Sequence, residues 1–232
     1  MKEQPILFKT AMVQAILNDT KTETRRDKKL KEINERPNEF FLESFYNGTA
    51  IFGLLSGKET YKVIKCPWQV GNTLWVKETW RPCLHNPKSP SEWERGIKYK
   101  ADGFVANIPK EENDWFDNLT KDGKFTWKSS MFIRRVFART FLKITDIKLE
   151  RIQDITPLGA RWEGVEKEFD DTVYWYKNYG KTGPSMFKQD PIQSYKSLWD
   201  SINGSGSWDA NHWIWVLKFD KIKDYENSTL VR

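Results

Sequence analysis

The chain has 232 residues, 15% of them aromatic, which is long enough to bury the core of one domain or of two small ones. Its formal charge of +6 is mild, so it is compatible with a phosphate-bearing partner but does not require one. With two histidines, two cysteines and no CxxC pattern, the sequence offers too few of these ligands for a zinc site, and we expect no metal and no cofactor.

No long apolar segment follows the first residues, so we expect neither a signal peptide nor contact with a membrane. Cys66 and Cys83 are then free thiols in a reducing compartment, and we assign the protein to the cytoplasm. The sequence leaves the oligomeric state open.

The first predicted elements are a short strand and a helix. Residues 6–8 are apolar and predict the strand, and Thr10 can cap the helix that follows it. The apolar residues of this helix recur at helical spacing and share one face; they are Met12, Val13, Ile16 and Leu17.

The segment after this helix is rich in groups that carry chemistry. Lys21 lies at a corner, and the next residues can run extended, which divides alternate side chains between two faces: Thr22, Thr24 and Arg26 on one, Glu23 and Arg25 on the other. A lysine three residues from a hydroxyl is a candidate base–nucleophile pair, and the arginines can hold an anion or an oxyanion. Charge runs are usually exposed, however, so this local sequence alone favours a solvated basic turn.

The middle of the chain alternates charged, aromatic and loop-forming segments. Residues 26–39 are charged and predict a mobile or helical insertion, whereas residues 40–55 predict a hairpin because Asn47-Gly48 is a strong type I′ turn signal. Residues 73–80 predict a strand. Residues 81–126 are rich in proline and show little periodicity, so we expect a long loop insertion rather than a separate core.

The last third returns to regular structure. Residues 136–152 predict a strand with a bulge near Thr145, and Thr156-Pro157 begins a short helix that Gly164 ends. A second helix is predicted at residues 195–202 and a last strand at residues 213–219. The sequence thus predicts many strands, few helices and no repeated βαβ units. This pattern indicates an α+β fold, a mixed β-barrel with short flanking helices and large loop insertions. Residues 225–232 are predicted to be a disordered tail.

Several blocks in order resemble the ASCH domain family, in particular the longer form common in phages and prophages. The matching blocks are residues 6–26, 66–80, 127–139, 150–155, 160–165 and 198–215. The family signature GxKxxTxR reads here as residues 19–26, with Asp19 in place of glycine, and aspartate tolerates the positive φ that a glycine can adopt. Asn72 is a second departure, since the family often has Gly-Asp there. The resemblance implies a PUA-like β-barrel: one domain over residues 1–224, with insertions at about 27–60 and 81–130.

The resemblance also implies an activity. Some small members of the family are amidohydrolases that remove the acetyl group from N4-acetylcytidine. Carried onto this chain, their roles make Lys21 the proton acceptor, Thr24 the nucleophile and Glu163 the proton donor; Glu166 and Glu168 lie close to the last position. The non-catalytic alternatives are a lysine that complements a helix C-terminus, a threonine in a strand and a glutamate on a helix surface.

This set is chemically consistent if two pKa values are shifted. Lys21 must be neutral part of the time, and both burial and the neighbouring Arg25 and Arg26 lower the pKa of a lysine from its reference of about 10.4. Glu163 falls in the last turn of its predicted helix, where the negative end of the dipole raises the pKa of a carboxyl and favours a proton donor.

Three further residues are candidate substrate-binding groups: Arg26, Glu78 and Trp75. The alternatives are an ion pair on a strand face for Glu78 and a core position for the tryptophan.

The preferred interpretation is a metal-independent amidohydrolase that acts on a small N4-acylated cytidine or similar nucleoside and binds single-stranded nucleic acid only weakly. The main alternative is a non-catalytic module that binds a modified base in RNA or DNA. A third, an auxiliary phage protein that engages another protein, rests only on where such sequences occur.

Overall fold

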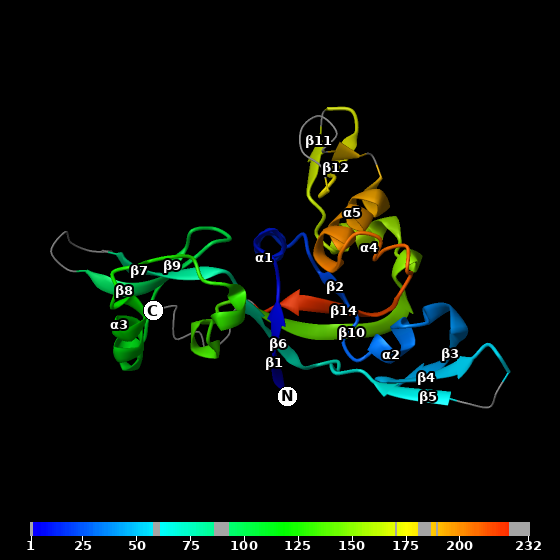
Figure 1. Ribbon diagram of the computed structural model, residues 1–232. Helices are drawn as coiled ribbons and strands as arrows, with labels where there is room; N and C mark the ends of the chain where they lie inside the picture. The colour runs from blue at the N-terminus through cyan, green and yellow to red at the C-terminus, as the bar shows by residue number, and fades with distance from the viewer. Residues whose placement is uncertain are drawn as a thin grey trace. The chain divides into compact units, whose positions relative to one another are not determined.

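Figure 1 shows an α+β protein in which strands in several sheets dominate and the helices are few and short. The computed structural model describes residues 2–57, 61–85, 93–169, 171–180, 187–188 and 190–222. The chain divides into two units: unit 1 comprises Met1–Leu17, Asn72–Lys143 and Lys221–Arg232, and unit 2 comprises Asn18–Gly71 and Ile144–Asp220. None of the described helices has the length and apolar character needed to cross a membrane.

Unit 1 contains two helices and two groups of paired strands. Its elements are β1 (Glu3–Leu7), α1 (Thr10–Leu17), β6 (Thr73–Lys77), β7 (Trp80–His85), β8 (Glu94–Tyr99), β9 (Val105–Asn107), α3 (Asn113–Thr120) and the start of β10 (Phe141–Arg151), with turns of 3-10 helix at Lys110–Glu112, Ser130–Phe132 and Arg135–Phe137. β6 pairs in parallel with β1 and antiparallel with the start of β10. β7, β8 and β9 form an antiparallel sheet. The predicted first helix is confirmed, and it buries Met12, Val13 and Ile16.

The expectation of loops without a core over residues 81–126 is wrong. β7, β8, β9 and α3 surround a cluster of buried side chains: Trp80, Ile97, Tyr99, Ala106, Ile108, Phe116, Ile133 and Phe137. Pro82 argued against a strand, but it lies in β7 at the edge of the sheet, where a missing N–H is tolerated. Alternate burial along short strands leaves only two or three apolar residues in each, which is too few for a clear periodic signal.

Unit 2 contains the remaining elements. They are β2 (Glu23–Arg26), α2 (Lys31–Asn34), β3 (Phe40–Tyr46), β4 (Thr49–Leu54), β5 (Tyr61–Lys65), the rest of β10, α4 (Pro157–Trp162), β11 (Lys167–Phe169), β12 (Tyr174–Lys177), β13 (Phe187–Lys188), α5 (Pro191–Asn203) and β14 (Trp213–Lys221), with 3-10 turns at Pro37–Glu39 and Ile152–Asp154. β14 lies between β10 and β2 and pairs antiparallel with β2. β3-β4-β5 and β11-β12-β13 are separate antiparallel sheets, and the strands of the described ranges form no closed barrel.

Predictions that rest on local turn and cap chemistry are confirmed in unit 2. Asn47 and Gly48 have φ values of 48° and 71°, as a type I′ turn between β3 and β4 requires. The side chain of Thr156 accepts a hydrogen bond from the backbone N–H of Gly159 at 3.0 Å and so caps α4. Gly164, with φ of 79°, follows the end of this helix. α5 contains the second predicted helix.

We expected the charged segment 26–39 to be either mobile or helical, and it contains a helix. α2 lies within it, and two apolar side chains fix the segment, because Leu30 and Ile33 are both 0% exposed. The side-chain amide of Asn34 adds two hydrogen bonds to the backbone of Trp213, at 2.8 and 2.9 Å. The assignment of residues 27–60 and 81–130 as insertions in one family domain stays a prediction, and the predicted tail at residues 225–232 lies outside the described residues.

The burial of Leu30 generates a test of this anchoring. Leu30→Ala removes a fully buried side chain, so we expect the free energy of unfolding to fall by about 2–5 kcal/mol in urea denaturation. Leu55→Ala is the matched control, because Leu55 is 64% exposed and its loss should change stability by no more than about 0.5 kcal/mol. Equal effects of the two substitutions would show that Leu30 does not anchor the segment.

Candidate functional site

The signature segment enters unit 2 at a tight corner against α4. Asp19 has φ of 56°, so it adopts the left-handed conformation expected for the residue that replaces the family glycine. Lys21 then forms a β-bridge with Glu163, the residue that ends α4, and the backbone N–H of Thr22 donates to the carbonyl of Trp162 at 2.8 Å. The corner therefore fixes the start of β2 to the C-terminal end of α4.

Lys21 is buried and its ammonium group is fully hydrogen-bonded. Its Nζ donates to Glu163 Oε2 at 2.6 Å, to the Glu163 carbonyl at 2.8 Å and to the Glu23 carbonyl at 2.7 Å, and the side chain is only 1% exposed. Burial, opposed by the Glu163 carboxylate, lowers the pKa of Lys21 to about 8. An ammonium has three N–H donors, so these three bonds describe the protonated form of Lys21. Because of its lowered pKa, this protonated form lies close in free energy to the neutral amine.

Glu163 is ionised, which corrects one expectation. Burial alone would raise its pKa, but the Lys21 and Arg25 cations outweigh burial and hold the pKa of Glu163 below its usual value. We expected a raised pKa from the helix dipole. α4 has only six residues, however, and the two cations in direct contact dominate so short a helix. Glu163 therefore holds no proton at rest that it could donate.

Arg25 is the central residue that sequence reasoning missed. Its guanidinium contacts Glu150 Oε1 at 2.9 Å, Glu163 Oε1 at 3.2 Å and Glu23 Oε2 at 3.4 Å, and it lies 5.8 Å from the ring of Tyr195. The family signature points instead to the neighbouring Arg26. The available signal was that Glu23 and Arg25 share a strand face, which is the pattern of an ion pair.

A glycine in α4 makes room for this guanidinium. A Cβ at Gly159 would lie 3.0 Å from Arg25 Nη2, which is tighter than ordinary van der Waals contact. α4 and α5 lie side by side (Figure 1), and Tyr195 of α5 brings its hydroxyl to 3.5 Å from Glu163 Oε1. The two helices thus enclose the carboxylate from one side while β2 supplies both cations.

The network reaches solvent at its outer edge. Lys218 of β14 stands opposite Glu23 of β2, and its Nζ lies 3.4 Å from Glu23 Oε1 and 4.5 Å from the ring of Trp162. The side chains of Lys218 and Glu150 are 33% and 25% exposed, in contrast to 1–5% for the inner members. Lys218 and Glu150 are therefore the members of the network that are accessible to solvent.

Thr24, the expected nucleophile, does not join this network. It is 0% exposed, and its Oγ1 makes no hydrogen bond within the part of the chain that the structure describes. Strand alternation places Thr24 on the face of β2 opposite Glu23 and Arg25. Arg26 lies on the Thr24 face, half-buried, and its Nη1 donates to the Arg25 carbonyl at 3.1 Å. The structure therefore brings Lys21 and Glu163 together and leaves Thr24 unbonded.

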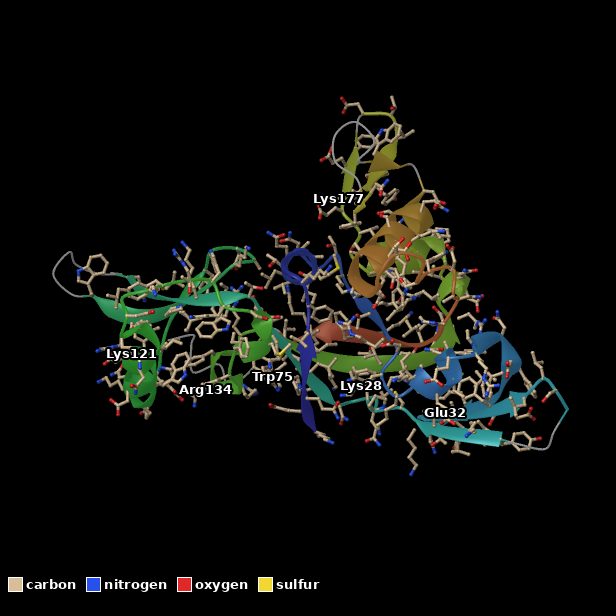
Figure 2. The ribbon with its side chains drawn as sticks, viewed as in Figure 1. Lys28, Glu32, Trp75, Lys121, Arg134 and Lys177 are labelled. Atoms are coloured by element: carbon tan, nitrogen blue, oxygen red, sulfur yellow. The ribbon has the colours of Figure 1, made fainter. Side chains whose placement is uncertain are left out.

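Glu78 and Trp75 belong to unit 1, whereas the other expected site residues belong to unit 2. Glu78 is 1% exposed and accepts hydrogen bonds from Arg139 at 2.8 and 3.2 Å and from Thr140 at 3.0 Å, so it forms the ion pair that was its alternative. Trp75, labelled in Figure 2, is half-buried, and Lys77 Nζ lies 5.5 Å from its ring. A substrate-binding role for either residue stays a prediction.

Three other candidate features are a second glutamate close to Glu163 in the sequence, a cavity and a possible metal site. Glu166 is exposed and pairs with Lys177 at 2.8 Å, so Glu163 is the one of the nearby glutamates that meets Lys21. A cavity of about 360 Å³ lies beside Lys196 and Asp200 of α5 and is not lined by Lys21, Thr24 or Glu163. Among the described residues, no three His, Cys, Asp or Glu side chains are grouped as a metal site requires.

Comparison with known proteins gives no relative: no protein-family model, curated protein or solved structure matches the chain. The likeness to the ASCH family therefore consists of the residues of the signature and the order of the blocks. The function of the site has to be argued from its geometry.

The buried pair predicts a stability that depends on pH. Glu163→Gln leaves Lys21 and Arg25 buried beside a neutral amide, so we expect the free energy of unfolding at neutral pH to fall by about 3–5 kcal/mol. The folded-state pKa of Glu163 lies below its ordinary 4.5, so the unfolded chain binds more protons as the pH falls below that value. The stabilisation by Glu163 is thus complete above about pH 4.5 and is lost in more acidic solution.

Urea denaturation of both proteins over a range of pH checks this prediction. The difference between wild type and Glu163→Gln should narrow as the pH falls below about 4.5. Glu168→Gln removes the same charge from an exposed strand position and is the control, with an expected change of no more than about 0.5 kcal/mol. A difference that does not vary with pH would contradict the ion pair.

Proposed function

We propose that the protein is a metal-independent amidohydrolase that acts on N4-acylated cytidine or a similar N-substituted pyrimidine nucleoside. One observation carries the proposal: Lys21, with a pKa of about 8, is held 2.6 Å from Glu163 at a corner of the strand that carries a buried, unbonded Thr24 hydroxyl. A buried hydroxyl without a partner is costly, and a bound substrate would account for it. Burial and a specific charge partner shift pKa values at functional sites, and both act on Lys21.

The first chemical step needs the neutral amine. Lys21 first loses one proton to solvent and gives up its bond to the Glu23 carbonyl, and the neutral amine then accepts the proton of the Thr24 hydroxyl. Thr24 Oγ1 attacks the amide carbon, and the carbonyl oxygen takes the negative charge. Arg26, on the same strand face as Thr24, is the cation that we assign to this oxyanion.

The second step needs a proton on the leaving amine. Since Glu163 is ionised at rest, it acts in this proposal as a relay: it takes the proton that Lys21 gained from Thr24 and passes it to the departing nitrogen. The C–N bond breaks, the acyl group stays on Thr24, and water then hydrolyses the ester. No step draws on a metal ion.

Fold and location belong to the same proposal. We infer a PUA-like barrel, supported by the neighbouring strands β10, β14 and β2 that carry the site. A cytoplasmic location is supported by Cys66 and Cys83, which are both free thiols.

A second candidate function is a non-catalytic module that binds a modified base in RNA or DNA. Two observations favour it: all three Nζ donors of Lys21 are engaged, and Thr24 lies on the other face of β2. In this case the network holds the shape of a pocket and Thr24 contacts the base without reacting. The two functions differ in whether Thr24 is needed for turnover.

Thr24→Val separates the two functions. Valine keeps the shape of threonine and removes a hydroxyl that has no hydrogen bond, so we expect stability to stay equal or rise slightly. Hydrolysis of N4-acetylcytidine, followed by chromatography of the released cytidine, should be lost. Lys21→Met should also abolish hydrolysis, with circular dichroism used to show that it is folded.

Thr22→Val is the matched control, because it makes the same change two residues earlier, directly before β2, and should keep activity. A chelator should leave the wild-type rate unchanged. Full activity in folded Thr24→Val would exclude this threonine as the nucleophile. Absence of turnover by the wild type on a panel of N4-acylated cytidines would favour the base-binding module.

The pKa of Lys21 predicts the pH dependence of the rate. Only the neutral amine is a base, so kcat/KM should rise tenfold per pH unit at acidic pH and level off above about pH 8. The profile is measured with the wild type at constant ionic strength. A rate that does not vary with pH through this range would contradict Lys21 as the base.

A further inference from the structure

One face of the β7–β8 pair in unit 1 carries positive charge. The register sets Arg81 opposite Lys98, and the backbone N–H of Lys100 donates to the carbonyl of Thr79, so side chains of these residues share one face. Trp80, Ile97 and Tyr99 point to the other face and are buried in the unit's core. The sheet is thus apolar on one side and basic on the other.

Trp127 joins this basic face. The guanidinium carbon of Arg81 lies 5.2 Å and Lys100 Nζ 5.8 Å from the centroid of its ring. Trp127 is nevertheless 42% exposed. We call the set of Arg81, Lys98, Lys100 and Trp127 the basic face.

The cations of the basic face have no acidic partners among the described residues. Within the ranges that the structure describes, no ion pair joins Arg81, Lys98 or Lys100 to a carboxylate, and Arg81 Nε is buried without a hydrogen-bond acceptor. Three carboxylates of the unit have other partners: Asp102 pairs with Arg139, Asp117 pairs with Arg95, and Glu94, on the same face of β8 as Lys98, accepts a hydrogen bond from Asn107. Three unneutralised cations beside an exposed tryptophan are a surface that an anionic partner can complete.

The charge of the chain is also concentrated in this unit. Unit 1 contains 19 basic and 12 acidic residues, whereas unit 2 contains 19 basic and 20 acidic residues. The whole excess of +6 therefore comes from unit 1. A partner with many negative charges is therefore attracted more strongly to unit 1 than to unit 2.

We propose that the basic face binds single-stranded nucleic acid. Lys98 lies on β8 and Lys100 directly follows its last residue, still bonded to Thr79; two residues of extended backbone span roughly 6.7 Å, which is comparable with the separation of neighbouring phosphates in an extended strand. Exposed tryptophan offers a stacking surface for an unpaired base, which a duplex does not present. This surface shares no residue with Lys21, Thr24 and Glu163 and does not depend on the proposed hydrolase function.

Fluorescence anisotropy with labelled oligo(dT) and oligo(U) tests the proposal on the full chain. Binding at low ionic strength should weaken as salt rises, with a log–log slope of about −2 for three phosphate contacts. Lys98→Glu/Lys100→Glu should weaken binding at least about tenfold and reduce the steepness of this slope. Trp127→Leu should weaken binding while leaving the slope unchanged, because it removes stacking and no charge.

The matched control is Lys121→Glu/Lys124→Glu, which makes the same charge change at exposed positions of the same unit; Lys121 is labelled in Figure 2. It should weaken binding far less than the double change on the basic face. Equal losses from the two double variants would overturn the proposal, as would no detectable binding by the wild type. Tighter binding of duplex than of single strands, or displacement of the oligonucleotide by polyglutamate at equal charge, would also overturn it. Retained binding by Thr24→Val would show that the surface acts independently of hydrolysis.

Discussion

The buried pair of Lys21 and Glu163 is the interaction on which the arrangement of unit 2 depends. Each charge removed from water costs several kcal/mol, and this cost is offset only while both partners and their hydrogen bonds are in place. The pair joins the start of β2 to the end of α4, and Arg25 extends the network to Glu150 on β10. Any displacement of α4 from β2 leaves an uncompensated charge, so the spacing of these elements is fixed electrostatically.

The complete hydrogen bonding of the Lys21 ammonium also limits its reactivity as a base. A lysine whose three donors are all engaged is stable as an ammonium and inactive as a base. Burial brings its pKa to about 8, so the neutral form is reached at moderate cost. Stability and reactivity therefore compete within one side chain, which is the usual relation between a strained or desolvated site and the fold that contains it.

Sequence reasoning correctly predicted features that depend on neighbouring residues. It failed for features that depend on residues far along the chain. The turn at Asn47-Gly48 and the corner at Asp19 depend on backbone conformations that a few residues determine. The position of Arg25 depends on carboxylates 125 and 138 residues further along the chain, so no spacing within the signature predicts it. The pKa of Glu163 was predicted in the wrong direction for the same reason, since the cations that lower it come from another element.

Gly159 shows how a residue without a functional group makes room for a charged neighbour. Its missing side chain leaves just enough volume for the Arg25 guanidinium to pass α4 and reach Glu163. A Cβ at this position would lie 3.0 Å from Arg25 Nη2, the nitrogen that also contacts Glu150, so the guanidinium would have to shift by a few tenths of an ångström. The volume left free at Gly159 therefore limits how closely a cation can pack against α4.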